Sequence, residues 1–196
     1  MGSEMCIRDS LDSCGGVTEG LASSTMQIVS EWVGKTDKDY TDGQLAVAHA
    51  IGEFDASGII IYGGLPRPDE YETDHFLGNL NLMRFGRRVS QDSCSGTNKS
   101  THTWKAEMRD VFQTIYFVES ELSLTRRNDG LQRVSLLADH VDVLVEDSEN
   151  LRWSLAGVRV DAELGNALRN EFLSDADYAT LRLATDSDPL YVIHNW

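Results

Sequence analysis

Apolar residues occupy alternate positions through much of the stretch from Val111 to Leu164, and this alternation constrains the fold more than any other feature. Successive side chains of a β-strand point to opposite faces, so the pattern places one face of each strand in a core and the other in solvent. Sheets with one wet face are typically antiparallel. The sequence therefore predicts an antiparallel sheet built from the runs at 111–118, 122–125, 134–145 and 158–164.

A tight turn is predicted between the second and third of these runs. Asn128, Asp129 and Gly130 are consecutive there, and Asp-Gly supplies the positive φ that a two-residue hairpin needs. We therefore expect the flanking runs to pair as a β-hairpin.

The half of the chain before this sheet has helical periodicity. A first helix is predicted within Gly15–Gly34 and a second from Thr41 to about Gly58. The second has an apolar stripe made of Val47, Ala48, Ile51 and Phe54. A short strand follows at 59–62, and the segment 65–103 has no readable period. The predicted fold class is therefore α+β, with one or two N-terminal helices packed on an antiparallel sheet.

The first ten residues, Met1–Ser10, are expected to be foreign to the protein. Residues 5–10 back-translate to the transposon end of a common DNA-sequencing adapter, and residues 1–4 extend the agreement. Such a segment is excluded from fold reasoning. We expect 11–196 to form a single globular domain whose natural N-terminus lies upstream.

Charge and hydropathy exclude some functions. The chain has 17 basic and 32 acidic residues, giving a net charge of −15, which disfavours binding to phosphate backbones. The densest basic run is Arg84–Arg88, most simply interpreted as solvated charge. The sequence contains no run of 18 apolar residues that would form a transmembrane helix.

Two cysteines remain once the adapter-like segment is set aside. Cys14 and Cys94 match no zinc-binding spacing, and they form either one disulfide or two free thiols. Both alternatives stay open on the sequence alone.

The sequence contains no recognisable motif for catalysis, for a cofactor or for a metal. Gly63-Gly64 follows the predicted strand at 59–62, but no Lys-Ser or Lys-Thr comes after it, which argues against a phosphate-binding loop. Acidic residues gather around the run 141–145, where they form either a calcium site or solvated loop charge. They are Asp139, Asp142, Glu146, Asp147 and Glu149. We therefore predict no catalytic residues, no cofactor, no metal and no enzymatic activity.

The order of these elements resembles the C-terminal part of minor type IV pilins and of type II secretion pseudopilins. The resemblance rests on Leu124 with Arg126 and Arg127, on the run Leu137–Val145 with its acidic loop, and on Val158–Val160. It covers about a quarter of the chain, and it implies that helix and sheet form a pilin-like domain.

The resemblance implies a structural subunit of a type IV pilus or type II secretion system. Its partners would be other pilin or pseudopilin subunits, without nucleic acid. It would be anchored in the inner membrane, facing the periplasm, through an N-terminal helix missing from this sequence. The alternatives are an unrelated antiparallel domain that serves as a soluble binding module, and an enzyme of unknown class.

Overall fold

The computed structural model describes residues 42–65, 73–94 and 103–196. The chain divides into two compact units, Met1–Ala56 and Ser57–Trp196, and each is treated by itself. Predictions about Met1–Ser10, about Cys14 and about a helix within Gly15–Gly34 fall outside the described residues.

The described part of the first unit is helix α2, Asp42–Phe54. The helix ends at Asp55, which has a positive φ of 53°, and the Ala56 amide bonds back to the Ala50 carbonyl at 3.2 Å. Val47 and Ile51 are buried as the apolar stripe predicts. Phe54 is 45% exposed, so its predicted place in the buried stripe is wrong.

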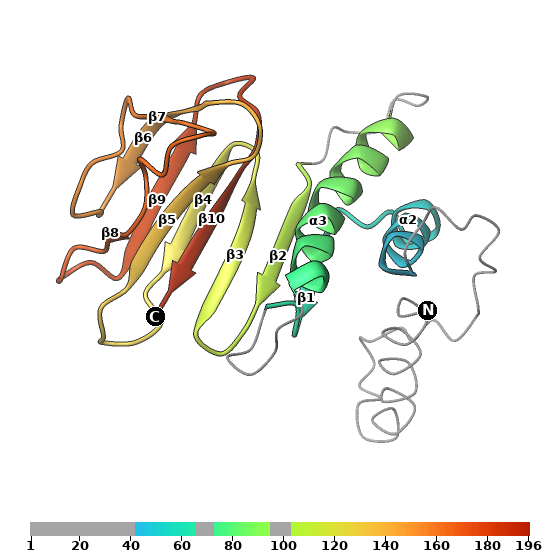
Figure 1. Ribbon diagram of the computed structural model, residues 1–196, viewed down its shortest axis with the longest axis horizontal. Helices are drawn as coiled ribbons and strands as arrows, with labels where there is room; N and C mark the ends of the chain where they lie inside the picture. The colour runs from blue at the N-terminus through green and yellow to red at the C-terminus, as the bar shows by residue number, and fades with distance from the viewer. Residues whose placement is uncertain (1–41, 66–72, 95–102) are drawn as a thin grey trace. The chain divides into compact units, whose positions relative to one another are not determined.

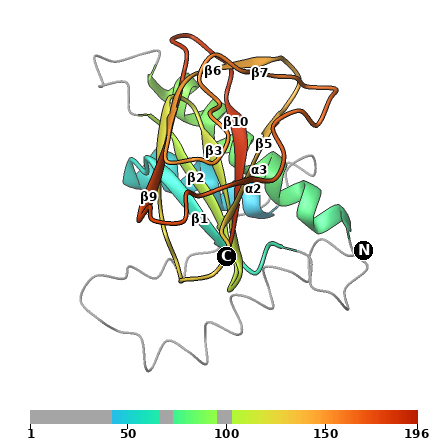
Figure 2. The same cartoon turned by 90° about the vertical axis from the view of Figure 1, so that its left-hand side faces the viewer.

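The second unit contains two β-sheets (Figures 1 and 2). In the six-stranded sheet β1 pairs in parallel with β2, and the remaining neighbours are antiparallel. Its order is β1 (Gly58–Tyr62), β2 (Lys105–Arg109), β3 (Gln113–Val118), β10 (Leu190–Asn195), β5 (Arg133–Ala138) and β8 (Asn170–Glu171).

The second sheet has four strands, and its inner face meets that of the first. Its order is β4 (Glu121–Thr125), β9 (Tyr178–Leu183), β6 (Val143–Glu149) and β7 (Arg159–Val160). One cluster of buried side chains joins the two sheets, with Val134 and Val192 from the first and Leu124 and Val145 from the second. Apolar faces of two sheets packed in this way form a β-sandwich.

Helix α3, Thr73–Cys94, connects β1 to β2 and packs against the strands it joins. The Trp104 indole Nε1 donates to the Met83 carbonyl at 2.9 Å, and the Tyr191 hydroxyl donates to the Leu80 carbonyl at 3.2 Å. Because α3 lies on one face of the six-stranded sheet and the second sheet covers the other, β3 is buried on both faces, from Thr114 to Val118.

The predicted fold class is wrong, although most predicted strands exist. The described residues form ten strands in two sheets and two helices, a mostly β architecture, in place of N-terminal helices on one antiparallel sheet. Within the second unit, the helix that packs on the sheet is α3, which follows β1 and lies in the segment 65–103, where the sequence has no readable period. The last predicted strand is also shorter than expected, since β7 ends at Val160 and Leu164 is 64% exposed.

The predicted hairpin around Asp129-Gly130 is wrong as well, because β4 and β5 belong to different sheets. The connection between them is held by side chains. Buried Gln132 donates from Nε2 to the Asn128 carbonyl at 2.9 Å and accepts the Arg127 amide at 3.1 Å. Arg126 donates to the carbonyls of Ala176 and Leu173 at 2.6 and 2.7 Å.

Candidate functional site

The carboxyl ends of the parallel strands β1 and β2 form the first candidate site. A right-handed strand–helix–strand unit brings these ends together with the N-terminus of the connecting helix, and open α/β sheets bind their ligands at this edge. The N-terminus of a helix carries a partial positive charge and free amides, which suit phosphate groups. Here β1 ends at Tyr62, β2 ends at Arg109 and α3 begins at Thr73.

Two glycines form the turn out of β1. Gly63 has a φ of +70°, which favours glycine because other residues are strained there. A Cβ on Gly64 would lie 2.8 Å from the Asn79 Nδ2 atom, and 3.0 Å from both Ile61 Cγ2 and Met108 Sδ. Asn79 on α3 donates from Nδ2 to the Gly64 carbonyl at 3.4 Å, so the turn is packed tightly against the helix.

Arg109 brings a permanent positive charge to this edge of the sheet. Its Nε and Nη2 atoms lie 2.7 and 2.6 Å from the Glu107 carboxylate. This hydrogen bond is the main reason that the pKa of Arg109 is raised, and partial burial opposes it. Tyr62, paired with Arg109 across the parallel strands, is 71% exposed. The remaining N–H groups of Arg109 can bind an anionic group.

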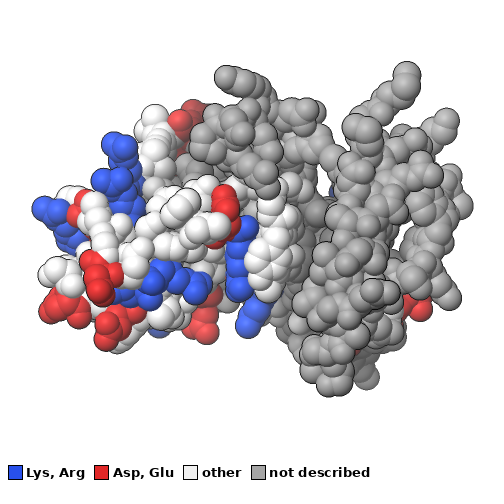
Figure 3. All heavy atoms as spheres, turned by 90° about the horizontal axis from the view of Figure 1, so that it is seen from below, with Lys and Arg blue, Asp and Glu red and all other residues white. Residues whose placement is uncertain are grey.

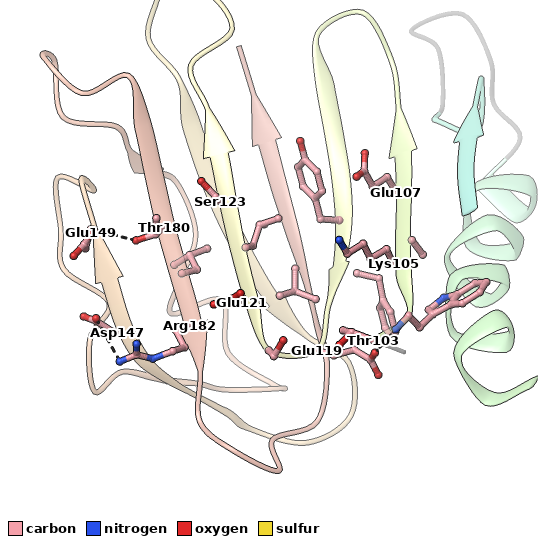
Figure 4. Close-up of a pocket in the computed structure, with 18 residues that line it drawn as sticks. Thr103, Lys105, Glu107, Glu119, Glu121, Ser123, Asp147, Glu149, Thr180 and Arg182 are labelled. Atoms are coloured by element: carbon pink, nitrogen blue, oxygen red, sulfur yellow. Dashed lines mark hydrogen bonds and ion pairs between the residues drawn. The ribbon is translucent and has the colours of Figure 1, made fainter. Parts of the chain in front are cut away.

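A hollow of about 620 Å³ lies between the two sheets, beside residues 103–107, which include the first half of β2 (Figure 4). Its volume is in the range of small-molecule sites. Side chains of β2, β4, β6 and β9 line it, and acids outnumber bases on its walls. The charged residues are Glu107, Glu119, Glu121, Asp147 and Glu149 against Lys105 and Arg182.

The acidic side chains that the sequence groups around Val141–Val145 do not converge on one point. Asp142 accepts the Ala162 amide at 3.0 Å, and Glu146 accepts from Arg182 at 3.0 Å. Across the described ranges, no three His, Cys, Asp or Glu side chains are arranged to hold a metal ion. On the face seen in Figure 3, basic and acidic side chains of the described residues are intermixed.

The disulfide between Cys14 and Cys94 stays a prediction. Cys94 is the last residue of α3, and neither its side chain nor Cys14 is among the described parts of the molecule. Sequence reasoning missed Asn79 and Arg109 as site residues. The signal that was available was Gly63-Gly64 after a strand, set aside because it lacks a phosphate-loop lysine.

Comparison with solved structures identifies the fold. A thiamine pyrophosphokinase from Bacillus subtilis aligns with a TM-score of 0.60 and 19% identity, over 81% of this chain and 64% of that chain. A thiamin pyrophosphokinase family protein from Enterococcus faecalis gives 0.58 and 19%, over 94% and 74%. The enzyme from Geobacillus thermodenitrificans gives 0.55 and 16%, over 82% and 63%. No family model matches the chain, and no curated protein sequence does.

These structures contradict the pilin interpretation and everything derived from it. The resemblance to pilins and pseudopilins, the role as a structural subunit, the pilin partners and the inner-membrane, periplasmic location are wrong, because the fold is that of thiamine pyrophosphokinases. The prediction that the chain is not an enzyme is overturned by the same likeness. Among the described residues, no helix is both long enough and apolar enough to cross a lipid bilayer. The strand–helix–strand unit and β-sandwich of this chain therefore have the thiamine pyrophosphokinase fold.

Proposed function

We propose that the protein transfers a diphosphate group from a nucleoside triphosphate to thiamine. The observation that carries this proposal is the match of 81% of the chain, at a TM-score of 0.60, to a structure named thiamine pyrophosphokinase. The chain spans 64% of that structure's length, so the activity of the whole protein is proposed here from part of the fold.

The edge formed by β1, β2 and the N-terminus of α3 suits the phosphate donor. The amide of exposed Gly63 and the first amides of α3 can bind phosphate oxygens, and the Arg109 guanidinium can neutralise their charge. Gly64 lets the turn pack against Asn79, which fixes the position of these amides. Fixed donors of this kind stabilise charge that develops during phosphoryl transfer.

The acid-lined hollow suits the acceptor. Thiamine carries a positive charge on its thiazolium ring, and the walls of the hollow carry five carboxylates against two cationic side chains. Glu107 belongs to both regions, because it lines the hollow and accepts from Arg109. The acceptor hydroxyl would attack the β-phosphorus of the triphosphate and release the nucleoside monophosphate.

The test is product formation by the full chain. The protein is incubated with thiamine, ATP and magnesium, and thiamine diphosphate and AMP are quantified by chromatography. We expect both products in equal amounts, since each transfer releases one AMP. A folded chain that forms neither product and binds neither substrate in calorimetry would contradict the proposal.

Asn79→Ala should lower kcat/KM by about tenfold, the equivalent of one net hydrogen bond of up to about 1.5 kcal/mol. The reason is that the Gly64 carbonyl loses its partner on α3, which loosens the turn. Gly78→Ala is the matched control, because a methyl group there meets no atom within 4 Å. Equal activity of the two variants would show that the turn between β1 and α3 has no part in the reaction.

A further inference from the structure

Three arginines on α3 border a hollow of about 260 Å³ that the proposed function does not use. Arg84, Arg87 and Arg88 lie within five residues, in a chain whose net charge is −15. The opposite walls come from the connection between β5 and β6, at residues 139–141, and from the two residues before β10. The basic run that the sequence suggests is solvated charge is therefore gathered around one concave surface.

Arg84 is held in a fixed position at this surface. Its Nη1 atom lies 2.5 Å from the Asp139 carboxylate and 3.0 Å from the His140 Nε2 atom, and its Nη2 atom donates to Asn81. A guanidinium has five N–H donors, and the contacts with described residues use at most three of them. The helix and the connection after β5 thus orient this cation in advance.

Within the described ranges, Arg88 has the fewest charged partners of the three cations. Its guanidinium lies 5.4 Å from the centre of the Phe85 ring, and no carboxylate of the described residues is within ion-pair distance of it. Among the described residues, Arg87 donates its Nε–H to Glu119. The carboxylates lining the hollow are Asp139 and Asp188, so three guanidiniums face two acids, with the His140 imidazole beside them.

We propose that this hollow binds a phosphate-type oxyanion, either free phosphate or the phosphate group of a small monoester. Several guanidinium donors converging on one small cavity are the usual recognition element for such anions. The arginines lie 11 to 15 residues along α3 from Thr73, which at about 1.5 Å per residue is roughly 17–22 Å from the edge formed by β1 and β2. The hollow is therefore distinct from the edge proposed for the phosphate donor, although it adjoins the acid-lined hollow, with which it shares Phe117. The proposal does not rest on thiamine diphosphate synthesis.

The test follows the arginine Nε–H and histidine signals of the full chain by nuclear magnetic resonance. The protein is titrated with sodium phosphate and with glycerol phosphate, each against sodium chloride at matched ionic strength. We expect saturable shifts of Arg84, Arg88 and His140 signals with a phosphate ligand and none with chloride. Saturation by phosphate alone identifies the free ion, and tighter binding of glycerol phosphate identifies a monoester.

Arg88→Gln should weaken phosphate binding about tenfold or more, the equivalent of one charge-assisted hydrogen bond. This residue forms no described ion pair, so its substitution should leave the fold intact. The matched control is Arg133→Gln, which removes the same charge from an exposed position at the far end of β5. Shifts that are equal in chloride and phosphate, or equal losses of affinity in the two variants, would overturn the proposal.

Discussion

Gly86→Ala is expected to destabilise the protein by about 2–4 kcal/mol, although alanine is the better helix former by about 1 kcal/mol. A Cβ at this position of α3 would lie 2.1 Å from the Cζ2 atom of Trp104. The indole has little freedom to move, because it is 2% exposed and its Nε1 donates to the Met83 carbonyl. Overpacking costs about 1–3 kcal/mol, and a lost buried hydrogen bond adds about 1–3 kcal/mol.

The control is Gly78→Ala in the same helix, where the new methyl group meets no atom within 4 Å. Helix propensity then acts alone, so this variant should be more stable by up to about 1 kcal/mol. Urea unfolding followed by Trp fluorescence and circular dichroism measures both free energies. If both variants gain stability, α3 does not pack on Trp104 as described.

The strand predictions succeeded where a strand has one buried face, because apolar and polar residues then alternate along the sequence. Residues of β4, β5 and β6 alternate between buried and exposed as the sequence indicates. The alternation of apolar and polar residues does not show which strands are neighbours in a sheet. Leu124 and Val134 both point into the same core, yet they come from opposite sheets. The hairpin prediction failed at this step.

The helix that covers the six-stranded sheet was hidden by its composition. Helix α3 has three arginines and several other polar residues, so its apolar side chains are too few for a clear stripe. Its contact with the sheet depends on a glycine beside a tryptophan and on hydrogen bonds to helix carbonyls. These interactions join residues far apart in sequence, and residue periodicity contains no trace of them.

The pilin resemblance was misleading because short alternating runs do not specify how strands are arranged. Its motifs are short alternating apolar runs separated by polar turns, and any antiparallel sheet with one exposed face contains such runs. The candidate site was hidden for a different reason. Gly64 and Asn79 lie 15 residues apart and meet only because α3 folds back along β1. The glycine pair was visible in the sequence, but its partner could be identified only in three dimensions.

The protein is expected to lose stability steeply in mild acid, and buried His194 should account for about 3 kcal/mol of the loss. The side chain is fully buried on β10, its ring is stacked on Phe172, and its Nε2 lies 2.8 Å from the Gln132 Oε1 atom. No described residue forms a hydrogen bond with its Nδ1. Burial, with a smaller contribution from Arg127, lowers the pKa of His194 from 6.5 to about 4.

The direction of this pH dependence follows from the number of protons that the folded and unfolded states bind. Because the folded state holds the imidazole neutral below pH 6.5, the unfolded chain binds more protons there, and stability falls as the pH drops from about 6.5 to about 4. His194→Gln can keep a hydrogen bond to Gln132 but cannot titrate, so urea unfolding at pH 7.5 and 4.5 should show a loss smaller by about 2.5 kcal/mol than in the parent. His140→Gln, at a side chain that is 70% exposed, should retain the full loss. A parent-like acid dependence in His194→Gln would mean that the imidazole is already protonated in the folded protein, and therefore that water reaches its Nδ1.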